Sequence, residues 1–370
     1  DTLYCIKKQS VTGGDILTFY QELQLNQAGS KALIRASESR KEKLRHTAVY
    51  LFKILLTVGF CTLFVTLFSL IFGTENSVAG VVILLTILTF RQADFGIHTP
   101  HGAAVMLIFY AILCIGPRAA CALPPGYAFI VNFACILTMM VLGCFNVIMC
   151  NQFTLVLGYL LLIGYDVTGD AYVKRLEALV IGAVISTVIF WYKHRHIEYE
   201  KKFSSIFKEL DITSERTMWQ VRLTLAVSTA MLIAGLLGIP RAMWIGIAVM
   251  SIMQPSREGV KQRVRLRAPG NILGGALFLI LYTVLPGDVC SYIGIIGGIG
   301  VGLSATYGWQ AVFNSFGGAA LAVPLFGAPG AVLLRIINNT LGSLYAFAFD
   351  SVCAKVSSVR ENAKENSLAG

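Results

Sequence analysis

Long apolar segments alternate with short polar stretches along this chain of 370 residues. A helix of about 20 apolar residues is long enough to cross a bilayer. The segments fall into two series of six, separated by a polar stretch. The first series covers 48–72, 78–90, 102–116, 127–143, 146–165 and 174–192, and the second covers 219–238, 242–254, 268–285, 289–303, 306–324 and 331–350. The pattern predicts an all-α, polytopic membrane protein with about twelve transmembrane helices.

The polar stretches set the expected domain boundaries. They divide the chain into an N-terminal tail (1–47), a first transmembrane repeat (48–192), a linker (193–218), a second transmembrane repeat (219–350) and a C-terminal tail (351–370). In the N-terminal tail we expect two short interfacial helices, one over Asp15–Leu25 and one that begins with an N-cap at Ser30. Apolar residues recur at helical spacing from Ile197 to Leu210, so the linker should form an amphipathic surface helix. The polar, mixed-charge start of the sequence is not expected to be a cleavable signal peptide.

Two apolar segments, 78–90 and 242–254, are markedly shorter than the roughly 20 residues of a straightforward span. Each is the second segment of its series. We expect them to be half-helices or to lie deep in the bundle.

Basic residues, prolines and glycines recur at corresponding positions of the two series, which indicates an internal duplication. The matched pairs are Lys53 with Arg222, Pro100 with Pro269, Pro117 with Pro286, Arg175 with Arg335 and Gly182 with Gly342. The first three pairs have one sequence separation, and the last two share a slightly shorter one. Each half has an even number of predicted crossings, so the two halves should form a parallel repeat about an axis along the membrane normal.

Composition and charge refine this picture. Only 14% of the residues are charged and 56% are apolar, which excludes the ordinary soluble classes. Most of the 30 Lys and Arg residues lie in the tails, the linker and the loops after the second segments. The positive-inside rule therefore places both termini in the cytoplasm. The nine cysteines are scattered without a C-x-x-C pair, so we expect buried thiols and no metal site.

The candidate chemistry is cationic, because a charge kept at membrane depth usually faces a bundle interior or a wet pathway. The candidate substrate-binding residues are Lys53, Arg175, Arg222, Arg263, Arg267, Arg335 and Asn338. A guanidinium can bind a carboxylate with two parallel hydrogen bonds, so a pathway lined in this way favours organic anions. Lipid headgroups and salt bridges are the alternative partners for the same cations. We expect no nucleic-acid partner.

Glycines recur every four residues in two of the predicted helices. Gly270 and Gly274 form one such set, and Gly294, Gly298 and Gly302 form the other. A bare helix face allows close helix packing and is compatible with a homodimer. No Walker-type lysine follows these glycines, so we expect no bound nucleotide and no cofactor.

Asp94, His98 and His101 have the spacing of one helical face and could couple transport to a proton gradient. Their position in a predicted loop makes an interfacial role the alternative interpretation.

The stretch from Gln254 to Leu281 resembles a known family. Gln254 and Pro255 are followed by Arg263, Arg267, Gly270 and Gly274, in the pattern Gln-Pro, Arg, then Arg-x-x-Gly-x-x-x-Gly. This pattern is similar to that of the fusaric acid resistance protein-like (FUSC) membrane family. The resemblance implies a bacterial inner-membrane protein similar to aromatic acid exporters, which move organic anions and often work with a periplasmic adaptor protein. Pro269 and Asn271 depart from the family pattern.

The residues and the resemblance together predict a transporter that exports or conducts small organic anions, with aromatic carboxylates as the expected class. The alternative is a non-transporting membrane scaffold or a protein that binds lipid headgroups. We expect no enzymatic activity, since the sequence has no H-E-x-x-H, no G-x-S-x-G and no paired carboxylates in the predicted helices. Removal of charge at Arg263 or Arg267 should harm function more than removal of His98 or His101.

Overall fold

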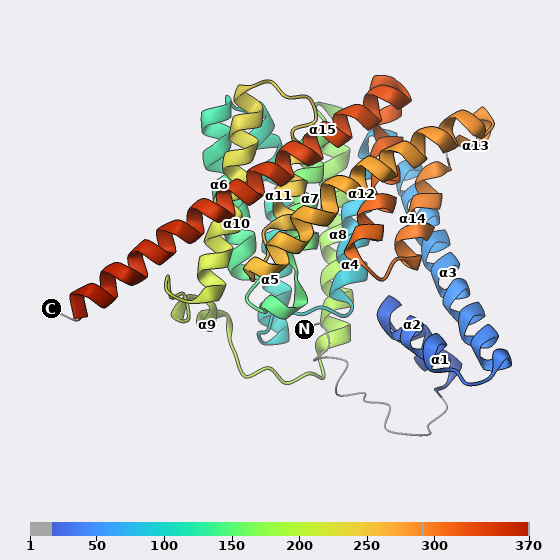
Figure 1. The fold of residues 1–370 in the computed structure, drawn as a ribbon, viewed down its shortest axis with the longest axis horizontal. Coiled ribbons are helices and arrows are strands. Elements are labelled where there is room, and N and C mark those ends of the chain that lie inside the picture. The colour runs from blue at the N-terminus through green and yellow to red at the C-terminus, as the bar shows by residue number, and fades with distance from the viewer. Residues whose placement is uncertain (1–16, 291, 369–370) are drawn as a thin grey trace. The chain divides into compact units, whose positions relative to one another are not determined.

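The structure is a computed structural model, and it describes residues 17–290 and 292–368. Within these residues the secondary structure is helical, and no strand occurs. Figure 1 shows the helices in chain order by colour. They are α1 (Phe19–Gln24), α2 (Gln27–Ala36), α3 (Arg40–Phe72), α4 (Ser77–Phe90), α5 (Thr99–Ala122), α6 (Pro125–Gly143), α7 (Gln152–Gly164), α8 (Asp170–His194), α9 (Phe203–Lys208), α10 (Glu215–Leu236), α11 (Met243–Ile252), α12 (Arg257–Val284), α13 (Gly287–Cys290), α14 (Ile293–Leu303) and α15 (Tyr307–Leu368).

Among the described residues, six helices are long and apolar enough to cross a membrane: α3, α5, α6, α10, α12 and α15 as far as Val356. Four shorter apolar helices, α4, α7, α11 and α14, lie among them in the sequence. The protein is therefore a multi-pass membrane protein. Every predicted apolar segment contains a helix, but the predicted total of about twelve spans remains a prediction.

Several helix boundaries differ from the predicted ones, and the cause is charge. Helix α3 begins at Arg40 and α12 at Arg257, well before the apolar segments that start at 48 and 268. Arg, Lys, Glu and Gln are good helix formers, so a helix continues past the point where hydropathy falls. Two predicted segments, 306–324 and 331–350, both lie in α15, which bends at Gly327 (φ 68°).

The chain divides into two compact units, Asp1–Leu63 with Pro269–Arg335 and Phe64–Ala268 with Ile336–Gly370. In the first unit, Lys53 of α3 donates to the Leu25 carbonyl (2.9 Å) and to Ser30 Oγ (2.6 Å). Ser30 itself is buried and lies inside α2, so the predicted N-cap there is wrong. Asn26 caps α2 instead, because its Oδ1 accepts from the Gly29 amide. Asp15 and Ile16, the start of the first predicted tail helix, lie outside the described residues.

Glycine packing in the first unit is only partly as predicted. An added Cβ would lie 2.2 Å from the Val312 carbonyl oxygen at Gly274 and 2.8 Å from Ala311 Cβ at Gly270, so both approach α15 closely. In α14 the predicted face of Gly294, Gly298 and Gly302 packs closely only at Gly302, where an added Cβ would lie 2.9 Å from Ile54 of α3. At Gly298 and Gly294 the nearest atoms would be at ordinary contact distance, 3.9 and 3.7 Å. Gly297 and Gly300 are the buried glycines of this helix, and they pack against aromatic residues of α15.

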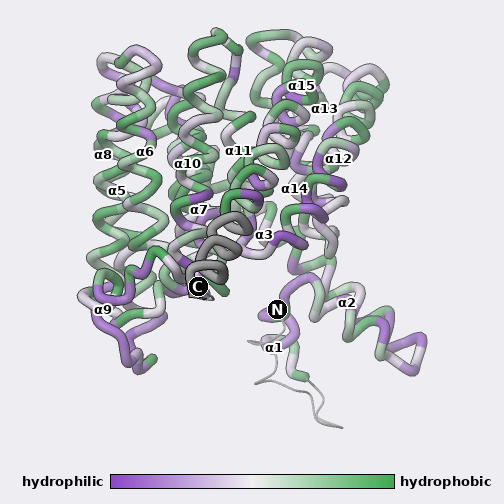
Figure 2. Tube along the Cα trace, turned by 60° about the vertical axis from the view of Figure 1, so that its left-hand side comes forward, coloured by the Kyte–Doolittle hydropathy of each residue, from purple (hydrophilic) through white to green (hydrophobic). Residues whose placement is uncertain are grey.

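The second unit is organised around three short helices. Helix α4 packs against α7 and α8, and α7 also packs against α5, α6 and α11. Nine of the ten residues of α11 are buried, Trp244 among them. In Figure 2, α5, α6, α8 and α10 run beside one another and are mainly hydrophobic, with hydrophilic stretches around α9. The second and eighth predicted segments therefore do lie deep in a bundle.

The predicted duplication has mixed support. Pro100 lies in the first turn of α5 whereas Pro269 lies inside α12, and Pro117 lies inside α5 whereas Pro286 follows α12. The proline matches therefore do not mark equivalent helix ends. The glycine match holds. Gly182 packs against Ile83 of α4, and Gly342 packs against Ile245 and Ala248 of α11, so each glycine contacts the short second helix of its half. The parallel two-repeat layout stays a prediction.

Candidate functional site

The arginines of the Gln-Pro stretch gather at the carboxyl end of α11. A helix ends with carbonyl groups that have no partner within the helix, and they favour nearby cations. Here the Ser251 carbonyl accepts from Arg263 Nη1 (2.8 Å) and from Gln254 Nε2 (3.2 Å). The Gln254 carbonyl accepts from Arg222 Nη2 (2.8 Å). The end of this short buried helix is therefore held by two guanidinium groups.

Arg267 is the most buried arginine of this group, with 9% of its surface exposed. Its Nη1 donates to Ser251 Oγ (2.5 Å) and its Nη2 to Asn339 Oδ1 (2.9 Å). The side chain thus joins α12, α11 and α15. Because water is largely excluded, its charge acts on nearby groups more strongly than it would at the surface.

Two further contacts complete the cluster. The Arg263 guanidinium lies over the Phe153 ring of α7, 4.8 Å from its centroid. Asp350 of α15 is 4% exposed and forms ion pairs with Arg222 (Nη1 to Oδ1, 3.2 Å) and Arg257 (Nε to Oδ2, 3.6 Å). We call Arg222, Ser251, Arg263, Arg267 and Asp350 the α11 carboxyl-end cluster.

Arg175 lies elsewhere, in a wholly different set of contacts. Only 3% of its surface is exposed, and it donates to the Tyr165 carbonyl (2.7 Å), Asn76 Oδ1 (2.9 Å) and the Glu75 carbonyl (3.2 Å). Residues of α8 and of the loops that flank α4 and α7 are held together in this way. Helices α7 and α11 pack against each other, and we call them the α7–α11 pair. Arg175 therefore fixes the end of this pair at which α7 finishes, opposite to the carboxyl end of α11.

The remaining predicted binding residues have partners of their own. Lys53 binds the α1–α2 segment, as described above. Arg335 donates to the Asn314 carbonyl (2.9 Å) within the first unit. Asn338 is fully buried, and its Nδ2 donates to the carbonyls of Pro240 (2.8 Å) and Arg241 (3.2 Å), which fixes the loop before α11.

Asp94, His98 and His101 do not share a helical face, because α5 begins only at Thr99 and Asp94 lies in the preceding loop. Asp94 Oδ1 accepts from the Gly96 amide (2.7 Å) and from Asn146 Nδ2 (2.9 Å). The two histidine rings lie 5.7 Å apart. Burial and the Asp94 carboxylate both raise the pKa of the nearby Tyr199 hydroxyl. Proton coupling by these three residues stays a prediction.

His101 instead binds the linker. The Phe203 amide, at the start of α9, donates to His101 Nδ1 (3.2 Å), and the His98 amide donates to the Lys201 carbonyl (2.8 Å). Lys201 Nζ donates to Glu209 Oε2 (2.8 Å), and this hydrogen bond lowers the pKa of the Glu209 carboxyl. The linker is therefore attached to the loop after α4 by defined hydrogen bonds.

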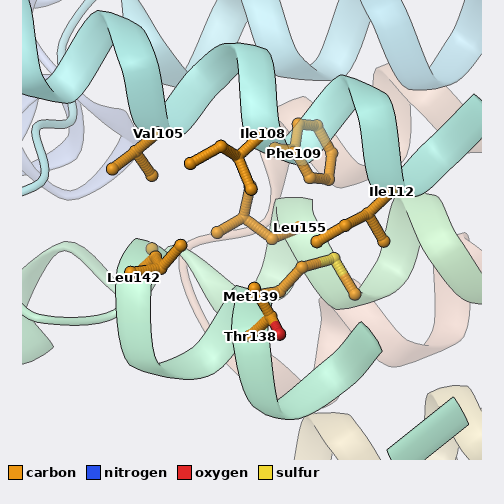
Figure 3. Close-up of a pocket in the computed structure, with 9 residues that line it drawn as sticks. Val105, Ile108, Phe109, Ile112, Thr138, Met139, Leu142 and Leu155 are labelled. Atoms are coloured by element: carbon orange, nitrogen blue, oxygen red, sulfur yellow. The ribbon is translucent and has the colours of Figure 1, made fainter. Parts of the chain in front are cut away.

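One cavity of about 10 Å³ lies among α5, α6 and α7. Its lining is almost entirely apolar, and Figure 3 shows the side chains of Val105, Ile108, Leu142 and Leu155 around it. Its volume is close to the minimum for one water molecule, and an apolar cavity of this size stays dry. It is a packing gap and contains none of the predicted site residues.

Sequence reasoning missed Ser251, Phe153 and Asp350. A serine or phenylalanine in an apolar segment carries no distinctive signal. Asp350 did carry one, since a lone carboxylate at the end of an apolar run, in a chain with many cations, predicts an arginine partner.

The geometry can be compared with known proteins. Residues 229–349 match the model of a family described as fusaric acid resistance protein-like. No curated protein and no solved structure matches the chain. The matched range includes Ser251, Arg263, Arg267 and Asn339, whereas Arg222 precedes it. This family points to a membrane transporter or resistance protein. The stretch from 229 to 349, which holds most of the α11 carboxyl-end cluster, thus matches the model of the fusaric acid resistance protein-like family.

Proposed function

We propose that this protein transports small organic anions, aromatic carboxylates above all, across the bacterial inner membrane. The observation that carries the proposal is the convergence of Arg222, Arg263 and Arg267 on the carboxyl end of one short, buried helix. Interrupted helices whose ends lie inside a bundle are a recurrent feature of transporter binding sites. The proposal places both termini in the cytoplasm and leaves room for a periplasmic adaptor protein.

The chemistry of the cluster suits an aromatic carboxylate. A guanidinium offers a planar fork of donors that matches the two oxygens of a carboxylate. It also stacks on aromatic faces, as Arg263 does on Phe153 at 4.8 Å. A benzoate-like ligand presents both groups at once, and an aliphatic acid presents only the first.

Binding would compete with the contacts that hold α11. A carboxylate that binds the Nη1 donors of Arg263 and Arg267 would draw them from the Ser251 carbonyl and Ser251 Oγ. Ligand binding is therefore coupled to release of the end of α11. Such a coupling is what a transport cycle needs, since a ligand can shift a conformational equilibrium only through differential contacts with its two states.

The test is flux in proteoliposomes with purified full-length protein. We expect uptake of radiolabelled benzoate to exceed that of acetate, and Arg267→Gln to reduce benzoate uptake at least tenfold. Arg195→Gln, a charge removal at an exposed position after α8, is the matched control and should leave uptake unchanged. Absence of flux for every anion tested, or equal flux in Arg267→Gln and wild type, would refute the proposal.

The scaffold alternative has one observation in its favour, namely that Arg222 is already engaged by carbonyls and by Asp350. In that case the arginines would serve only to terminate α11. Wild-type vesicles would then show no anion flux, and anionic phospholipid would remain bound through purification.

A further inference from the structure

The other end of the α7–α11 pair carries a second arginine cluster. Three consecutive residues at the carboxyl end of α7 each accept a hydrogen bond from a different arginine. Arg241 Nη1 donates to the Gly164 carbonyl (2.5 Å), Arg175 Nη1 to the Tyr165 carbonyl (2.7 Å) and Arg118 Nη1 to Asp166 Oδ2 (2.5 Å). The donors come from the loop before α11, from α8 and from α5.

This end repeats the chemistry of the α11 carboxyl-end cluster. Arg241 lies over the Tyr165 ring, 4.7 Å from its centroid, as Arg263 lies over Phe153 at the opposite end of α7. A carboxylate bound to arginine is present at both ends as well. Asp350 has this position at one end and Asp166 at the other.

The backbone at Arg241, in the loop before α11, is strained. Arg241 has φ 55°, in the left-handed region that an arginine rarely adopts. Asn338, fully buried on α15, holds this conformation by donating to the Pro240 and Arg241 carbonyls. Asn338 Oδ1 has no hydrogen-bond partner in the described structure. Strain of this kind concentrates at binding sites.

Charge and exposure favour a ligand. Three guanidinium groups bind three consecutive residues, one of which, Asp166, contributes a carboxylate, so these contacts carry an excess of positive charge. Arg175 is buried and Arg241 is half-buried, whereas the side chains of Arg118 and Asp166 are 34% and 23% exposed. The arginine that binds Asp166 is therefore accessible to a dissolved anion.

We propose that Arg118, Arg175 and Arg241 form a second carboxylate-binding site, in which the side chain of Asp166 occupies the place of the ligand carboxylate until the ligand displaces it. The ligand class is an organic carboxylate, so the inference rests on the proposed transport function and deepens it. The ten residues of α11 separate the two arginine clusters by about 15 Å. A transported anion would pass from one cluster to the other along the α7–α11 pair.

The Asp166 carboxylate is an internal competitor, and its removal should expose the site. Benzoate binding to detergent-solubilised, full-length protein is measured by isothermal titration calorimetry. Asp166→Asn should tighten binding about tenfold if Asp166 occupies Arg118 nine-tenths of the time. Arg118→Gln should weaken binding at least tenfold, and Arg118→Lys should recover part of the loss. Asp170→Asn, the same substitution at an exposed position nearby, should change nothing.

The outcomes separate this inference from the transport proposal. Unchanged benzoate affinity in both Asp166→Asn and Arg118→Gln overturns the second site, even if flux still depends on Arg267. Affinity that responds to Asp166 and Arg118 as expected upholds the site, even in a protein whose vesicles show no flux. An equal change in Asp170→Asn would mean a general charge effect and would also overturn it.

Discussion

Helices α4 and α11 are both short, buried and second in their half of the chain, yet they end in different ways. The last carbonyls of α4 accept from the backbone of the loop that follows, where the amides of Arg91, Gln92 and Ala93 donate to Ile87 and Thr89. The last carbonyls of α11 accept from arginine side chains of other helices. The end of α4 is thus satisfied by neutral local groups, whereas the end of α11 adds guanidinium groups of other helices to its local donors.

The difference shows how two halves with similar short helices can differ in where they place charged groups. A loop that caps its own helix leaves other groups available, and after α4 the linker is bound by the His98 backbone of that loop and by His101 at the start of α5. A helix end that depends on guanidinium groups concentrates positive charge inside the bundle. The asymmetry predicted from Arg263 and Arg267 against His98 and His101 has this physical basis.

The largest expected effect is at Arg267. Arg267→Ala removes hydrogen bonds to Ser251 and Asn339 in a buried setting, so the free energy of unfolding should fall by about 1–3 kcal/mol. His98→Ala should cost less than about 0.5 kcal/mol, as expected for a loop side chain away from packing features. Denaturant titration of the purified proteins measures both. A larger loss in His98→Ala would contradict the asymmetry between the two halves.

The two glycines that contact the short helices allow a matched test of packing. A Cβ at Gly342 would lie 2.8 Å from the Ile245 carbonyl oxygen, which is backbone and cannot move aside. A Cβ at Gly182 would lie 2.6 Å from the Ile83 side chain, which can rotate. Gly342→Ala should therefore lower the free energy of unfolding by about 1–3 kcal/mol, and Gly182→Ala by less. Equal losses in thermal melts would show that α4 and α11 are packed with the same tolerance.

Sequence alone predicted most helices and part of the site. Apolar runs located the short helices, and the Gln-Pro pattern located Arg263 and Arg267. Hydropathy could not locate the start of α12, because Arg257 to Arg267 form a charged helix, and it could not assign partners to the arginines. Arg118 and Arg241 were overlooked although they carry a signal. Both are basic residues in stretches assigned to the exterior, where the positive-inside rule disfavours them.

Lys53 and Arg222 are matched in the predicted duplication, but the two cations have different kinds of partner. Lys53→Met should release α1 and α2 from α3, because it removes donors to Leu25 and Ser30, and leave benzoate flux unchanged. Arg222→Met should reduce flux several-fold, because it removes a donor from the end of α11. Limited proteolysis of the N-terminal segment and the vesicle assay measure the two effects. Loss of flux in Lys53→Met alone would reverse the assignment.

The smallest expected effect concerns the linker, which residues of the first half bind. The Phe203 amide at the start of α9 donates to His101 Nδ1, so the imidazole supplies the acceptor that this backbone group needs. Lys201 and Glu209 form an ion pair within the linker that does not involve His101, and the hydrogen bond from Lys201 lowers the pKa of the Glu209 carboxyl.

Replacement of the imidazole should therefore loosen the start of α9 while the Lys201–Glu209 contact persists. Hydrogen exchange of a peptide covering 198–210, corrected for intrinsic rates, should become several-fold faster in His101→Phe than in the wild type. His196→Phe, at an exposed position, should behave like wild type. Equal protection in His101→Phe and the wild type would mean that His101 does not hold the linker. The residues that follow α4 would then lack the role that distinguishes them from the arginine-bound end of α11.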